Sequence, residues 1–251
     1  MKPLLELQHV QKIFDDGGEI QTVLDDINLS VYAGEAVAIV GASGCGKTTM
    51  AKAIAGFTDI SSGKIIFDDA DITNIKGSKR REVYQKMQMV FQQPQASFNP
   101  RRTLGFSIGE ALLNKKMAKS ERIQTVKNLM QQCSLAPEFF YRYPQEVSGG
   151  QCQRASIARA IALRPRLLLC DECTSALDTT TQAQIISLLN DLKCSYKMTV
   201  LFICHNLALA QAFCDRIIVM HEGKIVEQGS ADAVICAPQS KYTKQLLNAV
   251  L

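Results

Sequence analysis

Tryptophan is absent from the sequence, and aromatic residues make up only 6% of its 251 positions. Proteins that bind single-stranded nucleic acid by stacking its bases need exposed aromatic side chains, so this composition argues against that class. The formal net charge of +4 is mild for the length and by itself indicates no nucleic-acid partner. We therefore expect no nucleic acid among the partners.

Long hydrophobic runs are also absent: no segment approaches the roughly 18 apolar residues of a membrane-spanning helix. The sequence predicts a soluble chain that associates with a membrane only through a partner. Hydrophobic residues nevertheless amount to 47% of the chain, which is enough for the core of one large α/β domain or of two small ones.

A disulfide framework is not expected either. The nine cysteines are an odd number, they are scattered, and we find no signal peptide, which favours free thiols in a reducing cytoplasm. Cys170 and Cys173 do form a CxxC pair. A metal or redox role is the weaker interpretation of this pair, because the acidic Asp171 and Glu172 lie between its cysteines at a strand end.

Short apolar runs alternate with helical patterns, which predicts a largely parallel sheet. We expect its strands at 36–40, 64–67, 87–91, 167–170, 199–204 and 216–220, and a hairpin return at 224–227. Two segments depart from this alternation. Residues 4–31 combine short strands with the turn Asp15-Asp16-Gly17-Gly18, which suits an antiparallel flap.

The second segment, 94–146, has a helical pattern. Ser120 is a candidate N-cap, and the apolar residues Ile123, Val126, Met130 and Cys133 form one stripe at helical spacing. Ordinary core packing accounts for this stripe. Because no Pro/Gly-rich linker bounds the segment, we interpret it as a subdomain.

A glycine-rich block follows the strand at 36–40 and precedes a helix expected at 47–55, with Gly56 as its C-cap. This is the context that a phosphate-binding loop requires, because the glycines allow backbone N–H groups to approach the phosphates. Lys47 supplies charge to the β- and γ-phosphates, the Thr48 hydroxyl can bind Mg²⁺, and Thr49 can reach the α-phosphate. The predicted ATP-binding residues are Gly41, Ala42, Ser43, Gly44, Cys45, Gly46, Lys47, Thr48 and Thr49.

An apolar strand at 167–170 leads into two adjacent carboxylates. Asp171 can hold Mg²⁺ through water, and Glu172 can polarise a water molecule for attack on the γ-phosphate. A solvated strand end or a helix cap is the alternative for either acid. The phosphate loop at a suitable distance upstream favours the catalytic interpretation.

The block SGGQ comprises Ser148, Gly149, Gly150 and Gln151. Ser148 can cap a helix over 151–163, and the two glycines permit close approach of the backbone, which together predict a second anion site. A capped helix after a Gly-Gly turn is the alternative. The position of SGGQ, about twenty residues before the two carboxylates, favours the anion site.

With Gln92 of VFQQP and His205 of FICHN, these blocks occur in an order that resembles the ATP-binding subunits of ABC transporters over nearly the whole chain. The resemblance implies an α/β P-loop NTPase (RecA-like) core with an antiparallel β subdomain and an inserted α-helical subdomain. A single domain, 1–251, would then combine the core and β subdomain, 1–93 and 152–251, with a helical subdomain carrying the signature motif, 94–151.

The same resemblance implies further roles. Gln92 would contact Mg²⁺ and the attacking water, His205 would sense the γ-phosphate, and SGGQ would bind ATP held by a second subunit. The residues that match the D-loop, which crosses the dimer interface, are Ser175, Ala176, Leu177 and Asp178; a helix N-terminus capped by Asp178 is the alternative. Phe14 occupies the position of an adenine-stacking aromatic, with core packing as its rival interpretation.

Three segments, 91–101, 143–154 and 240–251, are similar to the peptide- and nickel-type importer ATPases. This similarity implies a second, non-identical ATPase subunit, two membrane permease subunits and an extracytoplasmic binding protein as partners. The chain would lie on the cytoplasmic side of the cell membrane. Nickel, another metal chelate and a peptide all remain possible substrates. A soluble ABC ATPase and a non-hydrolysing regulatory subunit are the alternative functions.

Overall fold

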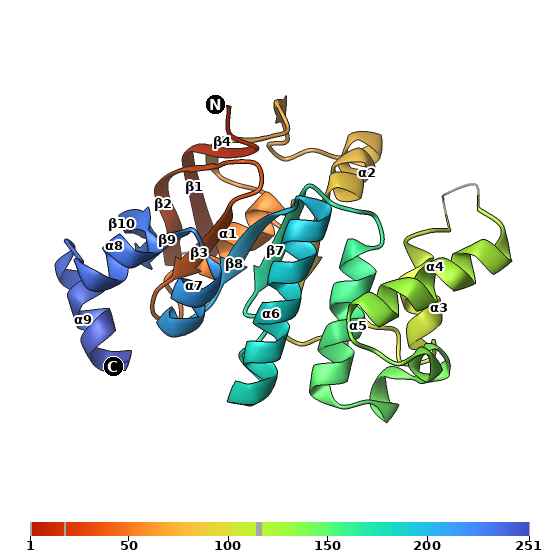
Figure 1. Cartoon of the computed structure of the whole chain (residues 1–251). Helices are drawn as coiled ribbons and strands as arrows, with labels where there is room; N and C mark the ends of the chain where they lie inside the picture. The colour runs from red at the N-terminus through yellow and green to blue at the C-terminus, as the bar shows by residue number, and fades with distance from the viewer. Residues whose placement is uncertain (1, 18, 114–116, 251) are drawn as a thin grey trace.

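The computed structural model describes residues 2–17, 19–113 and 117–250, and within them a six-stranded sheet forms the centre of the molecule (Figure 1). Its strands follow the order β10-β9-β3-β8-β7-β6. Their bounds are β3 (Ala36–Val40), β6 (Met87–Val90), β7 (Leu167–Asp171), β8 (Thr199–Ile203), β9 (Arg216–His221) and β10 (Lys224–Ser230). The prediction of a largely parallel sheet is confirmed, because only β10 runs antiparallel to its neighbour. The expectation that the strand at 64–67 belongs to this sheet is wrong, because it pairs in a second, antiparallel sheet.

Strand β3 shows how the sheet divides two hydrophobic clusters. Every residue of β3 is buried. Ala38 and Val40 belong to a cluster with helices α5 (Gly149–Ile161), α6 (Thr179–Tyr196) and α7 (Leu207–Phe213). Val37 and Ile39 belong to the other cluster, with α1 (Lys47–Ile54). Because successive side chains of a strand point to opposite faces, one short apolar run supplies both clusters.

A second, antiparallel sheet covers the α1 side of the core, in the order β2-β1-β4-β5. Its strands are β1 (Leu5–Asp16), β2 (Glu19–Val31), β4 (Ser62–Phe67) and β5 (Ala70–Asp71). The expectation of an antiparallel flap is confirmed, but the expectation of short strands is wrong. The pairing of β1 with β2 shifts register near His9 and Asp26, which both have positive φ, and these bulges break the alternation of side chains. Gly18 of the expected turn lies outside the described residues.

The segment after β6 is helical, as expected, and α3 and α4 lie at the end of the molecule opposite α8 and α9 (Figure 1). Its elements are η1 (Gln95–Ser97), α3 (Leu104–Glu110), α4 (Lys119–Gln132), η2 (Pro137–Tyr141) and η3 (Pro144–Glu146). The expectation that Ser120 is an N-cap is wrong. Ala118 is the N-cap, because its carbonyl accepts the Arg122 N–H that closes the first turn. Val126, Met130 and Cys133 are buried, whereas Ile123 is half-buried.

The remaining helices are α2 (Gly77–Lys86), which has no buried residue, and α8 (Ala231–Cys236) and α9 (Lys241–Val250) near the C-terminus. All nine cysteines are free thiols, as predicted. Within the described ranges, no helix has the length and apolar character needed to span a bilayer. Leu251, the last residue of the importer-like segment 240–251, lies outside the described residues.

Candidate functional site

The loop between β3 and α1 contains two glycines at which a side chain would collide with neighbouring backbone. Gly41 has φ 151°, and a Cβ atom on it would lie 2.2 Å from the carbonyl oxygen of Met220. Gly46 has φ 104°, and a Cβ there would lie 2.7 Å from the carbonyl oxygen of Val23. Backbone packs tightly behind the loop, so its path depends on these two residues.

Lys47 begins α1 and is only 5% exposed. Its Nζ donates hydrogen bonds to the carbonyl oxygens of Gly41 at 2.9 Å and Ala42 at 2.8 Å. The ammonium is thereby held against the loop, next to the positive end of the α1 dipole. Charge and helix N-terminus together suit a phosphate group.

Thr48 and Asp171 come from different elements, the start of α1 and the end of β7. The Thr48 hydroxyl donates to Asp171 Oδ1 at 3.0 Å. Burial raises the pKa of Asp171, and the neighbouring charge of Glu172 adds to this, while the hydrogen bond from Thr48 opposes it. A buried carboxylate beside a hydroxyl oxygen fits the oxygen ligands that Mg²⁺ prefers, since a cation would compensate its charge.

Gln92, Glu172 and Ser175 form a hydrogen-bonded group although Gln92 lies 80 residues from Glu172. Gln92 Nε2 donates to Glu172 Oε2 at 2.9 Å and to Ser175 Oγ at 3.4 Å. Glu172 has φ 46°, and its N–H donates to the carbonyl of Ile203 in β8. A left-handed backbone at a glutamate is uncommon, and such positions cluster at functional sites.

Two hollows adjoin these groups. One of about 380 Å³ is lined by Thr48, Gln92 and Asp171. The other, of about 470 Å³, lies between Gln92, Gly149 and Leu177. The fold thus brings together the loop, both carboxylates and Gln92.

The signature residues lie at the start of α5, where Gly149 lines the hollow shared with Gln92. Ser148 caps α5 by accepting the Gln151 N–H at 3.3 Å, while the Gln151 side chain accepts the Ser148 N–H at 2.9 Å. A Cβ on Gly150 would lie 2.9 Å from Thr181 Cγ2. In the described part of the chain, no hydrogen bond or ion pair joins residues 148–151 to the phosphate loop. Asp178 caps α6, as its alternative interpretation expects.

His205 and Phe14 stand at the surface. His205 follows β8 and is exposed, next to Asn206, which caps α7. Phe14 is 38% exposed in β1, and the Lys12 ammonium lies 4.4 Å from its ring centroid. The rival interpretation of Phe14 as a core residue is therefore wrong.

One contact to the phosphate loop was not predicted from the sequence. The Ala42 N–H donates to the Tyr242 hydroxyl at 3.0 Å, across a separation of 200 residues. Tyr242 lies in the segment 240–251, whose resemblance to importer ATPases was the only available signal.

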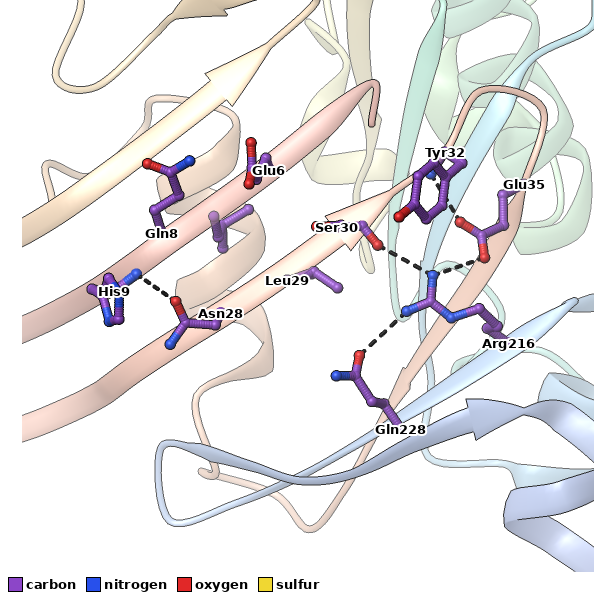
Figure 2. A pocket seen from close by; sticks show the side chains of 11 residues that line it. Glu6, Gln8, His9, Asn28, Leu29, Ser30, Tyr32, Glu35, Arg216 and Gln228 are labelled. Carbon is purple, nitrogen blue, oxygen red and sulfur yellow. Dashed lines mark hydrogen bonds and ion pairs between the residues drawn. The ribbon is translucent and has the colours of Figure 1, made fainter. Parts of the chain in front are cut away.

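A further hollow, of about 780 Å³, contains none of the expected site residues (Figure 2). Figure 2 shows Arg216 of β9 on the right of the lining residues, donating to the Ser30 carbonyl, to Glu35 and to Gln228. Because these partners come from both sheets, Arg216 joins the β subdomain to the core. Its charge is already paired with Glu35 at 2.9 Å.

Comparison with known proteins agrees with this geometry. The family model described as "ABC transporter" matches residues 24–175. The oligopeptide transport ATP-binding protein OppF of Salmonella typhimurium is 43% identical over 229 residues, which are 90% of this chain and 69% of that protein. OppF of Bacillus subtilis is 40% identical over 250 residues, 98% of this chain and 82% of that protein.

A solved structure is similar over most of the chain. The dimeric ATP-binding cassette MJ0796, in a post-hydrolysis state with ADP and Pi, superposes with a TM-score of 0.84 at 30% identity. The match covers 90% of this chain and 98% of the other.

Proposed function

The chain belongs to the ABC transporter family of ATP-binding proteins, and we propose that its ATP hydrolysis powers peptide import through partner permeases. The observation that carries this proposal is the pair of consecutive carboxylates: Asp171 contacts Thr48 of the phosphate loop, while Glu172 contacts Gln92. Among the substrates compatible with the sequence, peptides are favoured because the similar OppF proteins bear the name oligopeptide transport.

We propose the following roles for the site. Lys47 and the N–H groups of the loop bind the β- and γ-phosphates, with Phe14 against the adenine ring. Thr48, Asp171 and Gln92 would hold Mg²⁺, which when bound neutralises phosphate charge during phosphoryl transfer. Glu172 accepts a proton from the attacking water as that water bonds to the γ-phosphorus and ADP leaves. Gln92 orients Glu172 and the water, and His205 contacts the γ-phosphate.

Residues 148–151 are proposed to bind the ATP of a second cassette, with the D-loop, 175–178, crossing between the two. The separation of SGGQ from the phosphate loop within one chain supports this arrangement, as does the dimeric state of the similar cassette MJ0796. A non-identical partner cassette, two permeases and an extracytoplasmic binding protein complete the proposed importer. The chain would lie peripherally on the cytoplasmic face of the membrane.

The helical subdomain, 94–151, is proposed to contact the permeases. Phe106, Leu113 and Tyr141 are exposed there, and a hollow of about 320 Å³ opens between α3, α4 and η2. Rigid-body movement of this subdomain on ATP-driven closure would move the membrane subunits.

The assignment of Glu172 is tested by Glu172→Gln beside Lys47→Ala, measuring ATP affinity and turnover in the assembled transporter. We expect Glu172→Gln to keep ATP affinity and to lower turnover at least a hundredfold, because the water loses its base. Lys47→Ala should weaken binding itself. Normal turnover in Glu172→Gln would sink the assignment, and absence of turnover in the wild-type complex would favour the regulatory alternative.

The proposed contact between the helical subdomain and a permease is tested by cross-linking from an engineered cysteine, Phe106→Cys. The exposed Cys194 and Cys236 are first changed to serine, and Ile20→Cys, an exposed position in the β subdomain, serves as the control. We expect Phe106→Cys alone to link to a permease subunit. Links to soluble proteins only would instead favour a soluble ABC ATPase.

A further inference from the structure

Helix α9 reaches the phosphate loop through one side chain. The hydroxyl of Tyr242 accepts the N–H of Ala42 at 3.0 Å. None of the roles proposed above for the site involves this residue.

The contact falls on the peptide that also holds the lysine. The carbonyl of the Gly41–Ala42 peptide accepts Lys47 Nζ at 2.9 Å, and the N–H of the same peptide donates to Tyr242. A peptide unit is planar, so fixing its N–H also fixes the direction of its carbonyl. Hydrogen bonds in such a chain also polarise one another. Together with the Ala42 carbonyl, which accepts Lys47 Nζ at 2.8 Å, the orientation of this peptide therefore sets where the Lys47 ammonium lies.

Gly41 leaves this peptide free to adopt that orientation. With φ 151° and the Met220 carbonyl 2.2 Å from any Cβ, the residue packs directly against the end of β9. Glycine has a broad range of backbone conformations, so a tertiary contact is needed to select one. Tyr242 supplies such a contact.

The Tyr242 hydroxyl is itself held in place. Its ring stacks on His221 with centroids 3.8 Å apart and planes 20° apart. Just before α9, Glu227 accepts the N–H groups of Gln239 at 2.8 Å and Ser240 at 3.0 Å. Thr243 beside the tyrosine is fully buried. The acceptor is thus preorganised before any nucleotide binds.

We propose that Tyr242 is a positioning residue of the nucleotide site: its hydroxyl orients the Gly41–Ala42 peptide so that Lys47 is placed for the phosphates. The proposal rests on the proposed role of Lys47. Because coupling between two sites is reciprocal, nucleotide binding then also stabilises the docking of α9.

The test is Tyr242→Phe in the full chain, because this substitution removes the hydroxyl and keeps the ring that stacks on His221. We measure equilibrium binding of a fluorescent ATP analogue, and kcat and KM in the assembled complex. Loss of one hydrogen bond that favours the bound state should raise Kd and KM about threefold to tenfold while kcat changes little. Hydrogen exchange of α9 should slow on ATP binding in the wild type, and less in the variant.

Tyr196→Phe is the matched control, because the Tyr196 hydroxyl also makes a single hydrogen bond, to Gln132 at 2.7 Å, far from the loop. Unchanged ATP affinity in Tyr242→Phe would overturn the proposal. So would an equal loss in both variants, since that would report general stability. If Lys47→Ala binds ATP normally, the proposed function of the loop fails instead.

Discussion

A Cβ atom at Gly41 would overlap the Met220 carbonyl, whereas one at Gly34 would meet no atom within 4 Å. Both glycines have positive φ, 151° and 81°. Gly34 therefore requires glycine only for its positive φ, whereas Gly41 requires it also because a side chain would have no space there. Gly41 is also the residue whose carbonyl accepts a hydrogen bond from Lys47, so this one position affects the phosphate-binding loop directly.

We predict that Gly41→Ala raises the Kd for ATP more than tenfold, because the loop must shift to relieve a 2.2 Å contact with backbone. Gly34→Ala should leave ATP affinity unchanged and lower the free energy of unfolding by about 1 kcal/mol, the cost of a left-handed alanine. Nucleotide titration and thermal unfolding of both variants provide the measurement. Equal ATP affinity of the two variants would contradict the prediction.

Individual elements are joined by charged side chains as well as by the core. Asp68, in the turn between β4 and β5, pairs with Lys86 at the end of α2 at 2.6 Å and with Arg166 just before β7. The hydrogen bond from Lys86, aided by the charge of Arg166, holds the pKa of Asp68 below its ordinary value despite partial burial. This group therefore links the β subdomain to an edge of the central sheet.

We predict that Asp68→Asn lowers the free energy of unfolding at pH 7 by about 1 kcal/mol, a typical value for partly exposed pairs. Asparagine tolerates the positive φ of 53° at this position, so the change isolates the charge. A lowered folded-state pKa stabilises the fold above the unfolded pKa of about 3.9, and this contribution is lost as the pH falls through the folded value.

The difference between wild type and Asp68→Asn should consequently shrink toward zero below about pH 4. Denaturant unfolding from pH 7 to pH 3 under reducing conditions measures it. A difference that stays constant with pH would show that packing, not charge, connects these elements.

Across the whole molecule, the two motifs proposed to bind γ-phosphate lie on different parts of the fold. Lys47 belongs to a helix of one hydrophobic cluster, whereas Ser148 opens a helix of the cluster on the opposite face of the sheet. If both bind γ-phosphate, a second cassette must supply one of them. ATP then stabilises the closed pair, and hydrolysis releases it.

We predict that Ser148→Arg disables the site whose phosphate loop belongs to the partner, while this chain's own ATP affinity stays almost unchanged. Ser230→Arg is the matched control, because the Ser230 hydroxyl also accepts an N–H of the first turn of its helix, α8, but has no proposed contact with nucleotide. Each change should cost about 1 kcal/mol of stability through the lost cap. Nucleotide occupancy and turnover at each site of the assembled complex are the readouts, and loss of ATP binding in the isolated Ser148→Arg monomer would refute the shared site.

Features decided by neighbouring residues could be predicted from the sequence. The buried strands, the glycine-rich loop before α1 and the capped helix at Ser148 depend on local hydrophobicity, backbone freedom and side-chain caps. Where the local pattern was weak, prediction failed. Helix α2 buries no residue and has no apolar stripe that would indicate a helix. The bulges near His9 and Asp26 interrupt the alternation of side chains, so the two long strands were predicted as short ones.

The candidate site itself was predictable as a set of residue types but not as an arrangement. The sequence by itself was enough to predict that Lys47 binds phosphate, that Asp171 binds magnesium and that Glu172 acts as a general base, because each motif carries its chemistry locally. Only the tertiary structure decided that Gln92 contacts Glu172 from 80 residues away and that Tyr242 contacts Ala42 from 200. Such contacts depend on how the sheet orders its strands and where the last helix docks, and packing of the whole core sets both.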